Sequence, residues 1–217
     1  MVKLSELLRL TDAPIVVSGC LAGHRCRYDG QSKPVEAVQR LVETGRAFTV
    51  CPEVLGGLPT PRPASGIRLC QNVSDIADVN SGITSGITSG SASDRASDRA
   101  SSSTSDLTSD IMSGSASDIA SDIDVGEAVW RGRAELINRE GRLVTSNYKR
   151  GAQQALALAR AQGSTVAILK QHSPSCGVGS TGGADPWRRL PGDGVTAALF
   201  KSEGLTVVSD EDVEWDV

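Results

Sequence analysis

The stretch PIVVSGC at residues 14–20 decides the fold, because it places a short apolar run directly before a glycine and a cysteine. Two further segments repeat this arrangement. AFTV at residues 47–50 runs into Cys51, and TVAILK at residues 165–170 leads to HSPSCG at residues 172–177. Short apolar runs bounded by turn residues are typical of strands that are buried on both faces. We therefore predict three buried strands, each followed by a loop that carries a cysteine.

Helical segments alternate with these strands. Apolar residues at helical spacing follow Pro34 and end at Gly45, residues 145–162 are rich in Ala and Leu, and residues 195–202 form a third helical segment before a last strand at 205–208. Such alternation predicts an α/β protein with a Rossmann-like, mostly parallel sheet that carries helices on both faces. One local pair departs from the alternation, since residues 134–137 and 142–144 predict a small hairpin.

A repeat interrupts this pattern. Residues 81–124 form eleven four-residue units in unbroken register, and fifteen of these 44 residues are Ser. A period of four drifts around a helix and forms no continuous apolar stripe that could offset the entropy lost on folding. We predict a disordered, low-complexity, Ser- and Asp-rich insert at residues 73–124, within a single domain made of residues 1–72 and 125–217. The alternatives are a short β-repeat and a segment that binds a partner.

Composition and charge exclude several classes of protein. The 217 residues carry a net charge of −4, and the repeat alone carries −5, so the rest of the chain offers no strongly basic face for bulk nucleic-acid binding. No apolar run approaches the ~18 residues that a membrane span needs. Residues 1–10 mix charged side chains among their leucines, unlike a signal peptide. Five cysteines are too few for a disulfide scaffold. We expect a cytoplasmic protein without a membrane partner.

The cysteines have a common position in the predicted sheet. Cys20 and Cys51 come directly after predicted strands, and Cys176 lies six residues beyond a third strand. The carboxyl ends of parallel strands share one edge of an open α/β sheet, where the ligand crevice lies. We therefore expect these three thiols to converge at a shared functional site; the alternative is that they are unrelated buried thiols. Cys26 lies in the first of these loops, whereas Cys70 has no such placement.

Three converging thiolates suit more than one chemistry. A catalytic zinc uses three protein ligands and an open position, but the chain has no Cys-x-x-Cys pair and only two histidines. An iron–sulfur cluster prefers thiolate ligands, and three of them leave one iron open. The missing Cys-x-x-Cys pair also weakens a thiol–disulfide relay. The spacing alone does not choose between zinc and a cluster, so a nucleotide- or metal-binding module with a structural or catalytic zinc is the alternative function.

The sequence motifs resemble those of the thiouracil desulfidase family, in the same order and over nearly all of the chain outside residues 73–124. They are VSGCLAG with CRYDG at 17–23 and 26–30, CPEVLGGLPTPRP at 51–63, SPSCG at 173–177 and DGVTAAL at 193–199. The resemblance implies a 4Fe-4S cluster held by three cysteines, with the fourth iron free to take sulfur from a thiolated pyrimidine. It favours Cys20, Cys51 and Cys176 as ligands, with Cys26 in reserve.

The implied activity is a non-redox desulfuration that converts a thiouracil- or thiouridine-type substrate into the oxo base and sulfide. The attacking water must lose a proton, and Glu53, two residues from Cys51, is the predicted base, unless it caps backbone amides or pairs with Arg62. Ser173 is predicted to hold the water or the developing oxyanion, unless it is an ordinary turn hydroxyl. Arg62 and Ser175 are predicted to contact substrate. The substrate is a free base, a nucleotide or a thiolated RNA residue.

Overall fold

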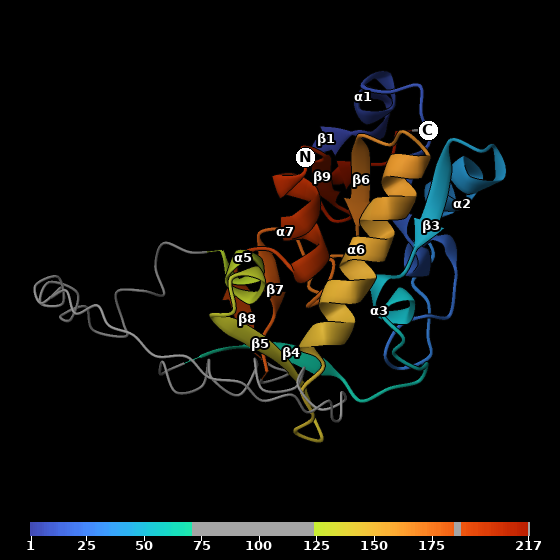
Figure 1. Cartoon of the computed structure of the whole chain (residues 1–217). Helices are drawn as coiled ribbons and strands as arrows, with labels where there is room; N and C mark the ends of the chain where they lie inside the picture. Colours follow the sequence, from blue (N-terminus) through green and yellow to red (C-terminus); the bar gives the residue numbers. More distant parts are fainter. Residues whose placement is uncertain (71–123, 185–187, 217) are drawn as a thin grey trace, which may run out of the picture. The chain divides into compact units, whose positions relative to one another are not determined.

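A four-stranded parallel sheet forms the centre of the fold (Figure 1). The structure is a computed structural model that describes residues 1–70, 124–184 and 188–216. The strands lie in the order β3, β2, β6 and β9, and their bounds are Ala47–Val50, Ile15–Ser18, Val166–Leu169 and Thr206–Ser209. The predicted α/β class with a parallel sheet is thus confirmed. The predicted insert lies outside the described residues, except for Asp124.

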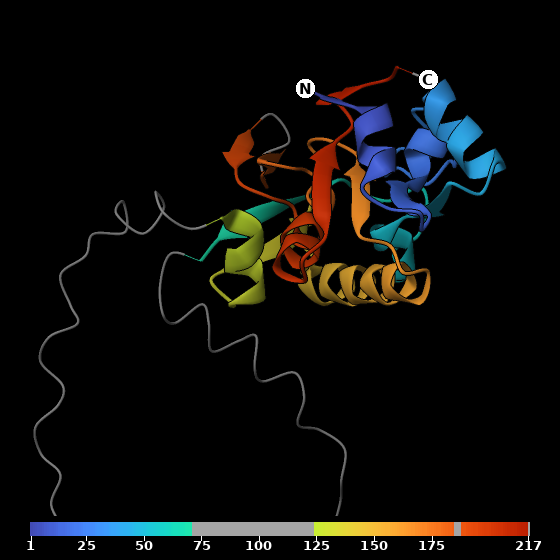
Figure 2. The same cartoon turned by 90° about the horizontal axis from the view of Figure 1, so that it is seen from above.

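Helices cover both faces of this sheet (Figure 2). On one face, α6 (Thr145–Ala161) and α7 (Val195–Ser202) pack against the alternate strand residues Val16, Ala167 and Leu169. On the other face, α1 (Leu4–Arg9) and α2 (Glu36–Glu43) pack against Ile15, Val17 and Ile168. Successive residues of a strand point to opposite faces, so a sheet that is covered on both sides needs continuous apolar strands. This requirement explains the unbroken apolar runs in the sequence.

The central strands end at the same level. Ser18 pairs with Val50 of the neighbouring strand β3, and Val17 pairs with Ile168 of β6. The backbone N–H of Lys170, just after β6, donates to Oγ of Ser18 at 2.9 Å. The segments that follow β2, β3 and β6 therefore all begin at one edge of the sheet.

A second layer contains an antiparallel pair of strands. β4 (Ser65–Leu69) pairs along its whole length with β5 (Ala134–Asn138), and α5 (Val125–Trp130) contributes to the same apolar cluster. The predicted hairpin forms in reduced length: residues 142–144 run antiparallel to the end of β5, with a bridge between Leu143 and Ile137. The backbone N–H groups of Asn138 and Val144 donate to the carbonyl oxygens of Arg142 and Leu136 at 3.0 and 2.9 Å. The longer partner of β5 precedes the repeat, where a local pattern could not identify it.

Several short elements complete the described part of the chain. β1 (Val2–Lys3) pairs in parallel with β10 (Val213–Glu214), and β7 (Ser180–Gly182) pairs antiparallel with β8 (Arg189–Pro191).

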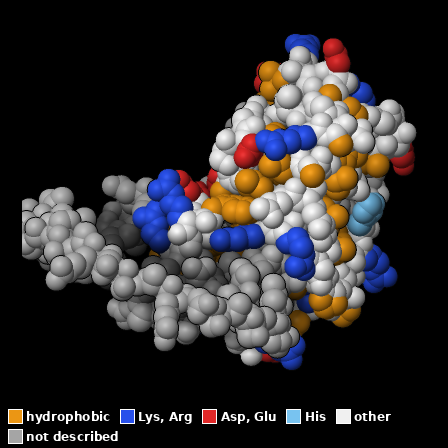
Figure 3. Space-filling view, in the orientation of Figure 1, with side chains coloured by type: hydrophobic (Ala, Val, Ile, Leu, Met, Phe, Trp, Pro, Cys, Tyr) orange, Lys and Arg blue, Asp and Glu red, His pale blue; other side chains and the backbone are white. Residues whose placement is uncertain are grey.

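The outer face of α6 and α7 shows apolar side chains scattered among basic ones (Figure 3). In the described ranges no helix is both long and apolar enough to cross a membrane.

Asp124 joins α5 to the loop before α7. Its Oδ1 accepts the backbone N–H of Gly126 at 2.9 Å and of Glu127 at 3.1 Å, and its Oδ2 accepts that of Asp193 at 2.6 Å. These contacts satisfy amide groups at the start of α5 that have no partner within the helix. Although it is the last residue of the repeat, Asp124 therefore belongs to the folded layer.

Two deletions that differ by one residue test this role. Replacing residues 81–123 by a short polar linker should leave the midpoint of thermal unfolding nearly unchanged, because the repeat offers no apolar face to the core. Replacing residues 81–124 should cost about 1–2 kcal/mol more, since the helix cap is lost. Equal midpoints for the two deletions would contradict the role of Asp124. A large loss in both would show that the repeat packs on the domain.

Candidate active site

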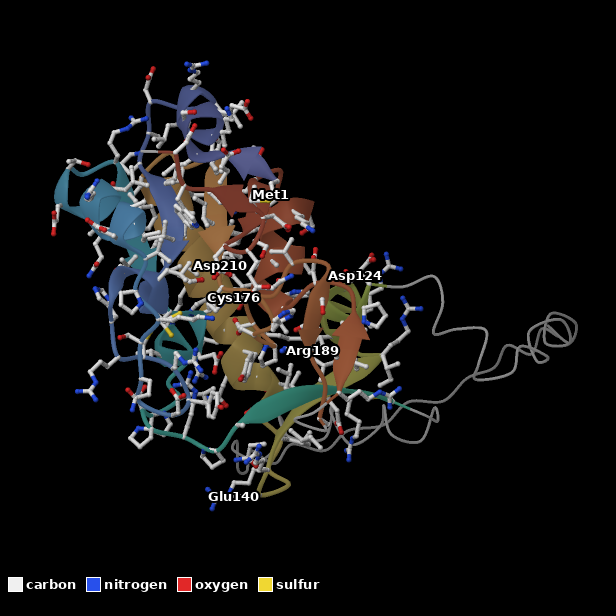
Figure 4. The ribbon with its side chains drawn as sticks, turned by 180° about the vertical axis from the view of Figure 1, so that it is seen from behind. Met1, Asp124, Glu140, Cys176, Arg189 and Asp210 are labelled. Atoms are coloured by element: carbon white, nitrogen blue, oxygen red, sulfur yellow. The ribbon has the colours of Figure 1, made fainter. Side chains whose placement is uncertain are left out.

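A cavity of about 410 Å³ is lined by residues that follow the central strands. Four cysteines line it, namely Cys20, Cys26, Cys51 and Cys176. Figure 4 shows sulfur atoms gathered beside Cys176. The volume suits a small-molecule ligand. The predicted convergence of Cys20, Cys51 and Cys176 is therefore what the structure shows, and Cys26 joins them.

Each of these thiols is positioned by the end of a strand. Cys20 lies in η1 (Gly19–Ala22), a single 3-10 turn after β2, and Cys51 is the N-cap of α3 (Pro52–Leu55) after β3. Cys176 lies in the loop after β6 and is 6% exposed. The Cys51 thiol donates to the backbone carbonyl oxygen of Cys26 at 3.7 Å. Cys70 lies outside the cavity lining.

Three of the four thiols hold their protons tightly. The side chain of Cys20 raises the pKa of Cys26 to about 11. The side chain of Cys26, together with burial, raises the pKa of Cys51 far above its ordinary value, and burial raises that of Cys176 to about 12. Crowded thiols lose their protons when a bound metal centre compensates the charge of the thiolates. Since iron–sulfur clusters are held by cysteine thiolates, this donor set fits such a cluster.

A single metal ion fits the arrangement less well. Within the described ranges, no three His, Cys, Asp or Glu side chains are spaced to hold one ion. In a 4Fe-4S cluster each cysteine ligates a different iron atom, so the sulfur atoms need not converge on one point. The described side chains therefore give no positive support to the zinc alternative.

Glu53 lies beside the thiols at the start of α3. Its Oε2 accepts hydrogen bonds from Arg62 Nε at 2.9 Å, from Arg62 Nη2 at 2.6 Å and from the Tyr148 hydroxyl at 3.0 Å. Its Oε1 accepts a longer hydrogen bond, of 3.3 Å, from the Ser173 hydroxyl. Glu53 and Ser173 both line the cavity, as predicted for catalytic residues. The ion pair between Glu53 and Arg62, which the sequence offered as the alternative, also forms. Glu53 therefore lines the cavity and is paired with Arg62 at the same time.

The Ser173 hydroxyl is held by the turn that carries Cys176. Its Oγ accepts the backbone N–H of Ser175 at 3.1 Å and of Cys176 at 3.2 Å, while its O–H donates to Glu53. A hydroxyl has one donor and two acceptor positions, and all three are used here. The turn therefore fixes both the position of Cys176 and the direction of the Ser173 proton.

Close backbone contact between α3 and α6 brings Tyr148 to Glu53. A Cβ at Gly151 would lie 1.8 Å from the carbonyl oxygen of Pro52, and one at Gly56 would lie 2.1 Å from that of Asn147. Any side chain at these two positions would push the helices apart. Glycine is therefore required at both positions for the carboxylate and the tyrosine to meet.

The chain is similar to known proteins over nearly its whole length. The family model for 2-thiouracil desulfurase matches residues 15–118 and 116–212. The chain belongs to the 2-thiouracil desulfurase family. It is 30% identical over 200 residues to the uncharacterized protein YbbK of Bacillus subtilis strain 168, covering 92% of this chain and 97% of YbbK. It is also 30% identical to a solved structure of the 4Fe-4S-dependent thiouracil desulfidase TudS, covering 92% of each chain, with a TM-score of 0.59. The resemblance deduced from the motifs is confirmed.

Two predicted substrate contacts lie behind the cavity wall in this family member. Arg62 is 8% exposed, does not line the cavity and also donates to the carbonyl oxygen of Cys26 from both terminal nitrogens at 3.1 Å. Ser175 is fully buried, and its Oγ lies 2.8 Å from the hydroxyl of Thr196. Both side chains already have protein partners, and their contact with substrate stays a prediction.

Sequence reasoning missed other residues of the cavity wall. Tyr148 lies on the apolar face of α6, where its spacing resembled that of an ordinary core residue. Lys170 follows β6, lines the cavity and donates to Asp210, which follows the adjacent strand β9, at 2.7 Å. The same edge rule that located the cysteines would have found this pair.

Proposed function

We propose that this chain is an iron–sulfur-dependent, non-redox desulfidase, which removes sulfur from a thiolated pyrimidine and yields the oxo base and sulfide. The observation that carries the proposal is the gathering of four thiols in one cavity with the carboxylate of Glu53. Family membership and the cluster dependence named for TudS support it. The overall reaction consumes water and transfers no net electrons.

We propose Cys20, Cys51 and Cys176 as the cluster ligands. Each follows a different one of three adjacent strands, so all three attach to the rigid sheet. Cys26 lies on the longer loop before α2 and is the reserve ligand. A 4Fe-4S cluster bound by three thiolates supplies one iron that has no protein ligand and can bind a thiocarbonyl sulfur.

In this proposal, Glu53 takes a proton from the water that attacks the thiocarbonyl carbon. Arg62 stabilises the carboxylate, because its buried guanidinium contacts Glu53 at 2.6 Å. Burial alone would lower the pKa of Arg62, but the charge of Glu53 and its hydrogen bond act together to raise that pKa above its ordinary value, so the guanidinium remains charged. Ser173 lies on the opposite side of the carboxylate and orients its Oε1. General-base assistance of this kind typically contributes ~10²- to 10⁴-fold in rate.

Cationic side chains around the cavity favour a nucleotide over a free base. Two acidic side chains line it, Glu53 and Glu211, against five basic ones, which are Arg27, Lys33, Arg139, Lys170 and Arg189. Of the basic ones, Lys33, Arg139 and Arg189 have no ion pair with a described residue. A cleft with a cationic excess attracts anionic ligands such as a phosphate group.

In this proposal the fold is Rossmann-like, and the protein is cytoplasmic.

Metal analysis of anaerobically purified protein tests the cofactor and its ligands. The wild type should contain about four irons per chain, with matching sulfide. Serine at position 20, 51 or 176 should each cause loss of most of the iron, because only two protein ligands would remain. The control variants Cys26→Ser and Cys70→Ser should keep it. Stoichiometric zinc without iron would contradict the cluster, and full iron content in any of the first three variants would contradict the ligand assignment.

The variant Glu53→Gln tests the base. It should lower kcat for 2-thiouracil by about 10²- to 10⁴-fold, since an amide cannot accept a proton from water. The amide oxygen can still accept from Arg62, so we expect the visible absorbance of the cluster to be unchanged. Turnover within a few-fold of the wild type would return Glu53 to a structural role.

The basic rim is tested by comparing two substrates. The double variant Arg139→Gln and Arg189→Gln should raise KM for 4-thiouridine monophosphate by about 10-fold or more, because charge-assisted hydrogen bonds to phosphate are lost. KM for 2-thiouracil should change little. Arg40→Gln, which removes an exposed ion pair with Glu36 on α2, is the matched control. Equal changes in KM for both substrates would contradict a phosphate site.

A further inference from the structure

The two oxygens of Glu53 have unequal surroundings. Oε2 receives three donors, two from Arg62 and one from Tyr148, at 2.6–3.0 Å. From the residues that the structure describes, Oε1 receives only the Ser173 hydroxyl at 3.3 Å. A carboxylate has about four lone-pair positions, shared equally by its two oxygens. Oε2 is therefore saturated, whereas Oε1 retains capacity for a further partner.

The contact between Arg62 and Glu53 is not the usual one. Guanidinium groups tend to bind carboxylates through two parallel hydrogen bonds, one to each oxygen. Here Nε and Nη2 of Arg62 both donate to Oε2, and among the described residues Arg62 makes no hydrogen bond to Oε1. A third side chain must therefore hold the carboxylate of Glu53 out of the parallel arrangement.

Tyr148 is the group in position to do so. It is 1% exposed, and its hydroxyl donates to Oε2 from the side of α6. At 3.0 Å, this contact directs the tyrosine O–H at Glu53. Burial and the charge of Glu53 raise the pKa of Tyr148 well above its ordinary value, so the hydroxyl keeps its proton. The close backbone contact at Gly151 fixes the position of this ring.

We propose that Tyr148 is a positioning residue that anchors Oε2 of Glu53, prevents a two-oxygen contact with Arg62 and so keeps Oε1 facing Ser173 as the oxygen that receives the proton of the attacking water. This assignment rests on the proposed function, in which Glu53 is the base. Atoms balance within the site, because the proton leaves the water and is bound at Oε1, while Tyr148 and Arg62 keep their own protons.

Rotation of the carboxylate is the expected result of removing the tyrosine hydroxyl. In Tyr148→Phe the ring volume is retained, but the side chain no longer donates to Oε2. Arg62 should then bind both oxygens and withdraw Oε1 from Ser173. Displacing a catalytic group by about 1 Å costs up to ~10²-fold in rate. We expect kcat for 2-thiouracil, expressed per bound cluster, to fall about 10- to 100-fold with KM unchanged.

A double-mutant cycle separates this role from a general loss of stability. Tyr148→Phe should have almost no effect on kcat in a Glu53→Gln background, because the residue acts through the carboxylate. Ser164→Ala is the matched control, since it removes a buried hydroxyl that donates to the Pro14 carbonyl oxygen and does not line the cavity. This control should leave kcat unchanged in either background. An equal loss from Tyr148→Phe in both backgrounds would overturn the proposal.

Crystal structures of the cluster-loaded wild type and of Tyr148→Phe give a readout that does not depend on turnover. The wild type should show both Arg62 donors on Oε2, and the variant should show one donor on each oxygen. A two-oxygen contact already in the wild type, or an unmoved carboxylate in the variant, would overturn the proposal. If the wild type shows the expected contacts but does not desulfurise 2-thiouracil, the proposed function fails while the anchoring by Tyr148 stands.

Discussion

The parallel hydrogen-bonding register of β2 between β3 and β6 is the constraint on which the site depends. Pairing of Ser18 with Val50, and of Val17 with Ile168, brings the three strand ends to one level. A shift of one residue in either pairing would turn the apolar side chains toward the wrong helix layer. Because both faces of the sheet are buried, the register is strongly specified. The helices therefore fix where the thiols lie, although they carry none of them.

Burial gives this edge of the sheet its chemical character. Thiols that resist ionisation lie next to an arginine–glutamate pair whose side chains are 4% and 13% exposed. A buried ion pair gains little net stability, but the loss of one partner leaves an uncompensated charge.

Binding of thiolate ligands to a metal centre releases protons, so cluster loading is linked to pH. Acid conditions should therefore oppose loading.

Much of this architecture could be predicted from the sequence, because strongly apolar runs and a long Ala-rich helix leave few alternatives. The three thiols at strand ends follow from one rule of parallel sheets, and β3 and α7 have the predicted bounds. The β4–β5 pair escaped prediction because its strands lie on either side of the repeat. Tyr148 escaped because its role arises from a contact between α3 and α6, and a sequence pattern does not reveal such contacts.

The hydrogen bonds of Arg62 link two parts of the site that the chain keeps separate. The same guanidinium holds the carboxylate of Glu53 and the backbone oxygens of Cys26 and Pro59, together with the Thr60 hydroxyl. Hydrogen-bonded networks of this kind are cooperative, and their members lose their partners together. The loop that carries Cys26 and the carboxylate of Glu53 are therefore held by one side chain. Local opening of that loop would also remove contacts that fix the guanidinium, so a partly opened molecule would lose the orientation of Glu53.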